Sequence, residues 1–120
     1  MSSLPQKETH PYVVESIRDF AAKSKGLRID GTRLSGEAKK TNGTWARDTI
    51  DLQFKLGNEN GKFCIDGSNF GENAQNIGVD GTTLEAKLRN RRNTNDEAFV
   101  ELAAILKIVD GNFFFRSECV

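Results

Sequence analysis

Residues 30–39 read DGTRLSGEAK, and residues 80–89, fifty positions later, read DGTTLEAKLR. Both segments open with Asp-Gly-Thr and then alternate apolar or small residues with polar ones. This period-two alternation is typical of a β-strand with one buried face, and Asp-Gly favours a turn because glycine accepts a positive φ. Each copy therefore predicts a turn followed by a half-buried strand, centred on Leu34 or Leu84.

The similarity extends beyond these strands at the same offset of fifty residues, without a gap. Leu56 and Leu106 follow four positions after Leu52 and Leu102, a spacing that fits one helical turn. Further matched positions are Phe20 with Phe70, Leu27 with Ile77, Ile29 with Val79, Ile50 with Val100, and the predicted hairpin turns Asn60-Gly61 with Asp110-Gly111 before strands at 63–65 and 113–115.

Each copy therefore predicts strand, turn, strand, loop, strand, short helical turn and strand. About fifty residues of this kind cannot bury two hydrophobic faces alone, so the copies must pack together or exchange strands. We expect an all-β fold with one pseudo-symmetric domain over residues 20–120, made of repeats 20–69 and 70–120. Residues 1–19 form an N-terminal extension, in which Val13, Val14 and Ile17 recur at roughly helical spacing.

The bulk composition argues against two classes of function. The 120 residues include 17 Lys plus Arg and 17 Asp plus Glu, so the formal net charge is zero and no global field attracts nucleic acid. The longest apolar run, residues 102–106, is too short to span a bilayer. We therefore expect no nucleic-acid partner and no membrane insertion. The basic residues Lys87, Arg89, Arg91 and Arg92 lack the interleaved aromatic residues on which bases stack.

Two cysteines, Cys64 and Cys119, stand at irregular positions and do not indicate a disulfide framework. The N-terminal sequence lacks the basic start and apolar stretch of a secretory signal, so the two features together predict a cytoplasmic protein. His10 is the only histidine, and no constellation of nucleophile, base or metal ligands accompanies it. We expect no enzyme activity, no metal and no cofactor.

Two features leave a structural and a functional interpretation open. Asp51 and Glu101 are either a catalytic carboxylate pair or symmetry mates that satisfy free amides at the start of a helical turn, and the structural interpretation is favoured. Trp45 either contacts a ligand or packs across strands, and packing is favoured because aromatic side chains dominate such contacts.

A series of short motifs runs along the chain in the order Phe20, Leu34, Thr41-Asn42-Gly43 with Trp45, Ile50-Asp51-Leu52, Asn58-Glu59-Asn60-Gly61 and Ser68-Asn69-Phe70. In order and spacing, these motifs resemble the cyanovirin-N homology (CVNH) family, particularly its disulfide-free fungal members. The resemblance implies a triple-stranded sheet and a β-hairpin in each half, with chain exchange between the repeats. The end-formed half would comprise about 20–56 plus 107–120, and the middle half about 57–106.

The resemblance also implies a lectin that recognises mannose-rich glycans, especially terminal α1,2-linked mannose, with one sugar site in each half. Such sites need carboxylate, amide and guanidinium groups held by turns, because sugar hydroxyls form directional hydrogen bonds. The middle-half site keeps polar groups at nearly every position, although Gly57 replaces a Glu. Its residues are Asn58, Glu59, Asn60, Ser68, Asn69, Glu72, Asn73, Arg89, Asn90, Arg91 and Asn93.

The end-formed site is expected to be the weaker of the two. Its residues are Lys39, Thr41, Asn42 and Asp110, but Ile108 stands where the family has Asn, and an apolar group facing hydroxyls leaves them unpaired. We expect one working site, in the middle half of a monomer, with Glu72 accepting hydrogen bonds from the sugar and Arg91 donating them. The alternative is a non-catalytic interaction or stress-related structural protein of the same fold, whose sugar sites have decayed.

Overall fold

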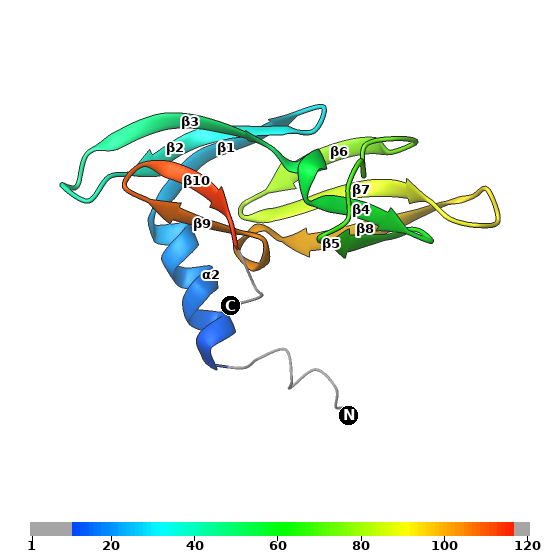
Figure 1. Cartoon of the computed structure of the whole chain (residues 1–120), viewed down its shortest axis with the longest axis horizontal. Coiled ribbons are helices and arrows are strands. Elements are labelled where there is room, and N and C mark those ends of the chain that lie inside the picture. Colours follow the sequence, from blue (N-terminus) through cyan, green and yellow to red (C-terminus); the bar gives the residue numbers. More distant parts are fainter. Residues whose placement is uncertain (1–10, 117–120) are drawn as a thin grey trace.

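The computed structural model of the chain describes residues 11–116 and consists of a helix followed by two copies of a five-stranded unit (Figure 1). The helix is α2 (Pro11–Ala22). The first copy contains β1 (Ser24–Asp30), β2 (Arg33–Lys39), β3 (Trp45–Asp51), the 3-10 helix η1 (Leu52–Phe54), β4 (Leu56–Glu59) and β5 (Lys62–Ile65). The second contains β6 (Gln75–Asp80), β7 (Thr83–Arg89), β8 (Asn95–Glu101), the 3-10 helix η2 (Leu102–Ala104), β9 (Leu106–Val109) and β10 (Asn112–Phe115).

The strands form two triple-stranded antiparallel sheets, β1-β2-β3 and β6-β7-β8, and two hairpins, β4-β5 and β9-β10. Their register follows the offset of fifty residues, since Leu34 pairs with Ile50 and Leu84 with Val100. Strand β5 packs against β8, and β10 packs against β3, so each hairpin lies on the sheet of the other copy (Figure 1). The predicted all-β fold, with one triple-stranded sheet and one hairpin per half, is confirmed.

The hairpin turns have the backbone conformation that their sequences require. Asn60 and Gly61 have φ values of 52° and 87°, and Asp110 and Gly111 have 47° and 83°. Two central residues with positive φ match the twist of the flanking strands, which explains the Asn-Gly and Asp-Gly pairs. Both hairpins therefore place the ends of their strands, and the polar turn residues, at defined positions beside the neighbouring sheet.

One hydrophobic core connects both copies. The strand residues Leu34 and Leu84 are fully buried, as their alternation predicts, and so are Phe20 and Phe70. The predicted short helical turn is present in each copy and covers residues 52–54 and 102–104, while Leu56 and Leu106, whose spacing suggested one helical turn, lie just beyond it and begin β4 and β9. The shorter 3-10 turn lets each buried leucine enter its hairpin directly.

The two acidic residues before the 3-10 helices have different roles. The Asp51 carboxylate caps η1, because it accepts a hydrogen bond from the Gln53 N–H at 3.2 Å and another from the Thr32 hydroxyl at 2.7 Å. Glu101 does not cap η2, and its carboxylate accepts from the hydroxyls of Thr82 and Thr83. Both residues have structural roles, as favoured. The prediction that Glu101 caps a helical turn is wrong, because its longer side chain reaches Thr82 and Thr83 instead.

Helix α2 is attached to the core at its C-terminal end. Phe20 is buried and its ring centroid lies 6.4 Å from that of Phe113, while the Ser24 hydroxyl donates a 2.7 Å hydrogen bond to the Phe20 carbonyl. The expected domain boundary at residue 20 falls inside this helix and stays a prediction.

No helix in the described part of the chain has the length and apolar character needed to cross a membrane. His10 and Cys119 lie outside the described residues, as do the side chains of residues 13 and 14.

Candidate functional site

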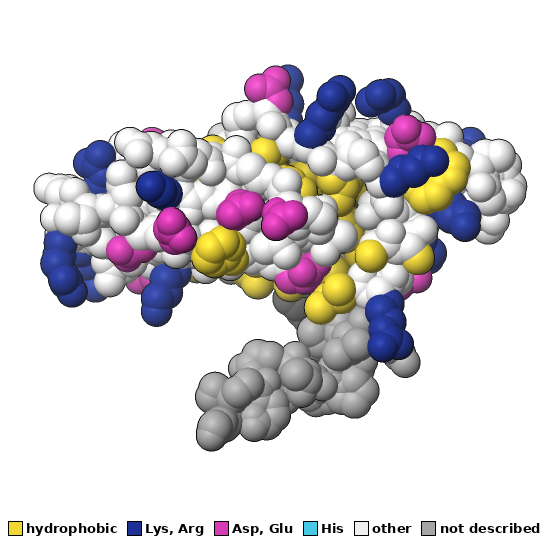
Figure 2. Space-filling view, turned by 180° about the vertical axis from the view of Figure 1, so that it is seen from behind, with side chains coloured by type: hydrophobic (Ala, Val, Ile, Leu, Met, Phe, Trp, Pro, Cys, Tyr) yellow, Lys and Arg dark blue, Asp and Glu magenta, His cyan; other side chains and the backbone are white. Residues whose placement is uncertain are grey.

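Two loops that carry candidate residues of the two halves lie at opposite ends of the molecule (Figure 1). Loop 40–44 joins β2 to β3, and loop 90–94 joins β7 to β8. Both close in the same way, because the N–H of Lys40 donates to the Thr44 carbonyl at 2.7 Å and that of Asn90 to the Thr94 carbonyl at 2.8 Å. From behind, basic side chains stand toward both ends of the long axis and along the upper edge, and acidic and hydrophobic side chains lie between the two ends (Figure 2).

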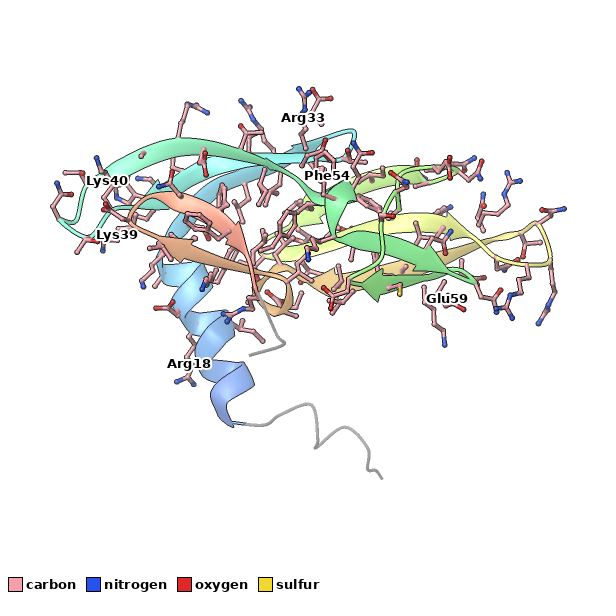
Figure 3. All side chains as sticks on the ribbon, viewed as in Figure 1. Arg18, Arg33, Lys39, Lys40, Phe54 and Glu59 are labelled. Carbon is pink, nitrogen blue, oxygen red and sulfur yellow. The ribbon has the colours of Figure 1, made fainter. Side chains whose placement is uncertain are left out.

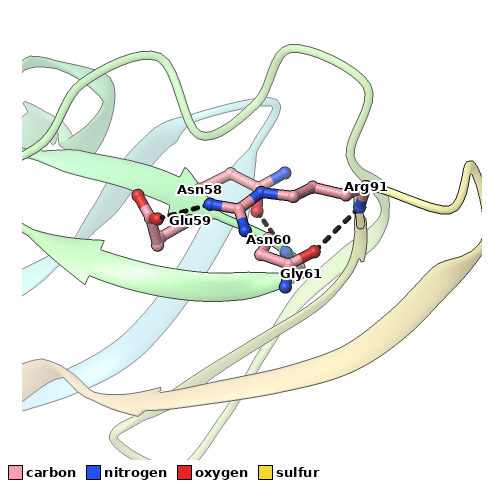
Figure 4. A network of polar contacts seen from close by, with 5 residues as sticks. All are labelled: Asn58, Glu59, Asn60, Gly61 and Arg91. Carbon is pink, nitrogen blue, oxygen red and sulfur yellow. Dashed lines mark hydrogen bonds and ion pairs between the residues drawn. The ribbon is translucent and has the colours of Figure 1, made fainter.

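In the middle half, side-chain amides join the β4-β5 turn to loop 90–94 (Figure 4). The Asn60 side-chain oxygen accepts a 2.8 Å hydrogen bond from the Arg91 N–H. The Asn58 amide accepts from the Gly61 N–H at 2.8 Å and donates to the Arg89 carbonyl at 3.0 Å. The turn and the loop are therefore held as one platform, which we call the middle platform (residues 58–61 and 89–94).

An exposed ion pair stands on this platform. The Arg91 guanidinium lies 3.3 Å from the Glu59 carboxylate, and their side chains are 75% and 68% exposed (Figure 4). Solvent-exposed pairs of this kind stabilise a fold by only about 0–1 kcal/mol, so both groups can exchange partners at little cost. The pair presents a carboxylate acceptor and a guanidinium donor side by side.

Several candidate asparagines have a structural reason for their identity. Asn60, Asn69, Asn73 and Asn93 all have positive φ values, between 52° and 65°, a conformation in which Asn is enriched. The Asn90 side chain closes its own loop, accepting from the N–H groups of Arg92 and Thr94 at 2.9 and 3.1 Å. The amide-rich sequence thus reflects turn geometry as well as any ligand.

The segment after β5 lies against strand β4. Asn69 forms a bridge with Gly57, and its N–H donates to the Gln53 carbonyl at 2.7 Å. Ser68, Asn69, Glu72 and Asn73 are exposed. Within residues 11–116, no hydrogen bond joins the Glu72 side chain to the middle platform, so the expected partnership of Glu72 and Arg91 at one sugar stays a prediction.

Two residues that the sequence reasoning missed lie beside loop 90–94. The Asn95 amide donates to the Gln75 side-chain oxygen at 3.3 Å. The matching pair fifty residues earlier is Trp45 with Lys25, whose ammonium lies 4.3 Å from the ring centroid. The offset of fifty residues could have identified this pair in the sequence, since Gln75 and Asn95 correspond to Lys25 and Trp45. Trp45 pairs with Lys39 across the strands, which agrees with the favoured packing role.

The end-formed half has a hollow at the equivalent place. Thr41 donates its N–H to the Asp110 carboxylate at 2.9 Å, and Gly111 donates to the Lys39 carbonyl at 3.0 Å, so this loop and turn are also joined. Ile108 is only 6% exposed and belongs to the core. The hollow has a volume of about 520 Å³ and is lined by Lys23, Lys39, Lys40, Thr41, Asn42, Gly43, Ile108 and Asp110. It contains all four residues of the expected second site.

The two halves use different acceptors for the same contact, and this predicts a different response to pH. The backbone N–H and hydroxyl of Thr41 hydrogen-bond to Asp110 and lower the pKa of its carboxyl below the usual 3.8. A depressed pKa means that the contact is complete above pH 3.8 and weakens as the pH falls through the lower folded value. The equivalent Asn60 amide does not titrate.

We therefore expect the Thr41 amide signal to shift on acidification below about pH 4, while the Arg91 amide signal follows only the general drift of the spectrum. A two-dimensional NMR pH titration measures both amides in one sample. An Asp110→Asn variant is the control, because it should remove the Thr41 transition and leave Arg91 unchanged. Equal transitions at Thr41 and Arg91 would contradict the assignment.

The described residues contain no cluster of three or more His, Cys, Asp or Glu side chains that would hold a metal ion. A second hollow of about 210 Å³ lies on the outer face of the β6-β7-β8 sheet, beside the exposed Phe99. It includes none of the predicted site residues. The candidate chemistry is therefore hydrogen bonding and ion pairing by the two loop-and-turn regions.

Comparisons with solved structures agree with this fold. The NMR structure of GzCVNH from Gibberella zeae matches with a TM-score of 0.73 and 28% identity, over 82% of this chain and 98% of that one. A MoCVNH3 variant in complex with (N-GlcNAc)4 matches with a TM-score of 0.75 and 21% identity, over 82% and 97%. The microvirin:mannobiose complex matches with a TM-score of 0.68 and 20% identity, over 82% and 98%.

Sequence comparison gives the family directly. Among curated proteins, no sequence matches this chain. The family described as "CVNH domain" matches residues 20–114, which include every candidate site residue and the strands of the described chain up to the last residue but one of β10. This match covers most of the chain and begins at Phe20, the first residue of the predicted domain. The chain therefore belongs to the CVNH domain family.

Proposed function

We propose that this protein is a carbohydrate-binding lectin whose main site is the middle platform, with mannose-rich glycans ending in α1,2-linked mannose as its ligands. Membership of the CVNH domain family supports sugar binding, and two solved relatives of the same fold are complexes with (N-GlcNAc)4 and mannobiose. The observation that carries the choice of site is the exposed Glu59–Arg91 pair on two loops joined by hydrogen bonds.

The geometry suits a ligand with adjacent hydroxyl groups. The Arg91 guanidinium offers several donors in a fixed plane, and the Glu59 carboxylate offers acceptors 3.3 Å away. A pair of sugar hydroxyls would accept from Arg91 and donate to Glu59, replacing a contact that contributes little to stability. Because the turn and the loop are already held together, ordering them costs little on binding.

The extent of the sugar site, the oligomeric state and the location of the protein are inferred from the sequence. Glu72, Ser68 and Asn69 would extend the site along the exposed segment that follows β5. We infer a monomeric, cytoplasmic protein without catalytic function. A single site per chain would give no avidity, so a monomer would cross-link multivalent glycans poorly.

The alternative function is a non-catalytic interaction protein with decayed sugar sites. The scaffold roles of the Asn58, Asn60 and Asn90 side chains favour it, because these residues are explained without any ligand. The two functions differ in what the exposed Arg91 does, since the scaffold uses only its backbone N–H and the ion pair.

Replacing Arg91 by alanine is expected to weaken binding of α1,2-linked dimannose by about 1–2 kcal/mol, because a charge-assisted hydrogen bond is lost. The measurement is a two-dimensional NMR titration of the full chain. Thr41→Ala, the matched position in the other half, is the control and should change the affinity little. Shifts confined to residues 39–42 and 107–110 would show that dimannose binds in the end-formed half and would contradict the choice of the middle platform. No shifts at all would favour the interaction protein.

A further inference from the structure

We propose that the hollow of the end-formed half binds an anionic sugar, a hexose that carries a phosphate or a sulfate group. The hollow lies between loop 40–44 and the β9-β10 turn, and three lysines line it together with a single carboxylate. The inference rests on the proposed lectin function, to which it adds a second class of ligand at a second site.

Two of the lysines are held in position by their stems or neighbours. The Lys39 ammonium lies 5.8 Å from the centre of the Trp45 ring, within reach of a cation–π interaction. The Lys40 stem packs on Gly111, where an added Cβ would approach its Cγ to 2.8 Å. Figure 3 shows both residues at the same end of the molecule. Lys39 is therefore placed next to strand β3 and Lys40 next to the β9-β10 turn, and both residues line the hollow.

The carboxylates nearby leave these two ammonium groups available. Asp110 is the acidic residue of the lining, and Thr41 already hydrogen-bonds to its carboxylate at 2.9 Å. Lys23 pairs with Asp19 of helix α2 at 3.3 Å. Within residues 11–116, no carboxylate lies within ion-pair distance of Lys39 or Lys40. An incoming anion would therefore meet two ammonium groups that form no direct ion pair with a described residue, although Lys40 is near enough to Asp110 for its charge to help lower the pKa of that carboxyl.

The pseudo-symmetry shows that this charge balance belongs to one half only. In the middle half, Glu59 pairs with Arg91, and the Asp96 carboxylate lies directly against Gly61 of the turn. The equivalent positions in the end-formed half are Val109 and Ala46, and Ala46 packs beside Gly111. At these two positions the scaffold therefore carries carboxylates in the middle half and apolar groups in the end-formed half, whereas Asp110 of the end-formed half corresponds to the neutral Asn60.

The size and the other lining groups indicate a sugar rather than a bare anion. A volume of about 520 Å³ lies within the usual range for small-molecule sites, roughly 300–1,000 Å³. Ile108 contributes a small apolar area to the lining, since 6% of its surface is exposed, and Thr41 and Asn42 supply polar groups for sugar hydroxyls. Lysine ammonium groups bind phosphate as point charges. A hexose phosphate would use all three features.

The test is a set of parallel NMR titrations of the full chain with mannose 6-phosphate, mannose, inorganic phosphate and α1,2-linked dimannose. Mannose 6-phosphate is expected to shift the signals of residues 39–43 and 110–111, and its affinity should fall roughly tenfold when the ionic strength is raised to about 0.5 M. Mannose and inorganic phosphate should each bind this region at least about tenfold more weakly. The sulfated hexose should behave as the phosphate does.

The double variant Lys39→Gln and Lys40→Gln should weaken mannose 6-phosphate by about tenfold or more, since exposed ion pairs contribute up to about fivefold each. The matched control changes the distant exposed lysines Lys55 and Lys62 to Gln and should leave the affinity unchanged. Equal binding of mannose, equal binding of inorganic phosphate, or no shifts at residues 39–43 would each overturn the proposal. Dimannose shifts at residues 89–93 test the main site separately, so the two failures are distinguishable.

Discussion

Truncating Leu34 or Leu84 to alanine is expected to lower the free energy of unfolding by about 2–5 kcal/mol, the range for removing a fully buried leucine side chain. Both side chains have no exposed area, and they occupy equivalent places in the two sheets. They also belong to one core cluster, which includes residues from both hairpins and from helix α2. The loss should therefore destabilise the whole chain in one cooperative transition, whichever copy carries the change.

Chemical denaturation followed by both fluorescence and circular dichroism measures this effect, because coincident curves indicate a single transition. Phe99→Ala is a suitable control: Phe99 is 60% exposed on the outer face of β8, so its truncation should cost less than about 1 kcal/mol. Two separate transitions in the Leu84→Ala variant, with the first copy still folded, would contradict the exchange of hairpins between the copies.

The fold was predictable because its signals are local and occur twice. The alternation around Leu34 and Leu84 reports a sheet with one buried face, and the Asn60-Gly61 and Asp110-Gly111 pairs report hairpin turns. The offset of fifty residues then shows that the two copies share one architecture. The place of Leu56 was not predictable from spacing, since four residues separate equivalent positions in a helical turn and also span a short 3-10 turn plus a strand residue.

The candidate site was predictable only in part, because a polar side chain in a loop has two possible roles. Sequence identifies Asn58 and Asn60 as hydrogen-bonding residues, but only coordinates show that their amides join a turn to a loop. The end-formed half shows the converse. Ile108 was expected to oppose sugar hydroxyls, yet it is almost wholly buried, and the hollow above it is lined mostly by polar residues. The difference in charge between the two halves depends partly on Val109 and Ala46, which replace Glu59 and Asp96. Apolar residues of this kind do not mark a binding site in the sequence.

Replacing Gly57 by glutamate, the residue that the sequence resemblance implies for this position, is expected to destabilise the protein by about 3 kcal/mol without improving sugar binding. A Cβ atom on Gly57 would stand 2.8 Å from the Ser68 backbone nitrogen and 3.1 Å from the Gly67 Cα and the Ser68 carbonyl oxygen. All three are backbone atoms, so rotation of a side chain cannot relieve the contact, and forcing atoms into a packed region costs about 1–3 kcal/mol or more.

Thermal and chemical denaturation measure this loss, and the pseudo-symmetry supplies the control. Lys107 occupies the matching position in β9 and is exposed, so Lys107→Glu should change the free energy of unfolding by no more than about 0.5 kcal/mol. In Gly57→Glu, the segment of residues 67–69 has to move away from β4, and this breaks the Gly57–Asn69 bridge beside the proposed sugar site. A stable variant with tighter dimannose binding would show that the segment yields easily. Gly57 would then limit affinity instead of maintaining the packing of Ser68 and Asn69.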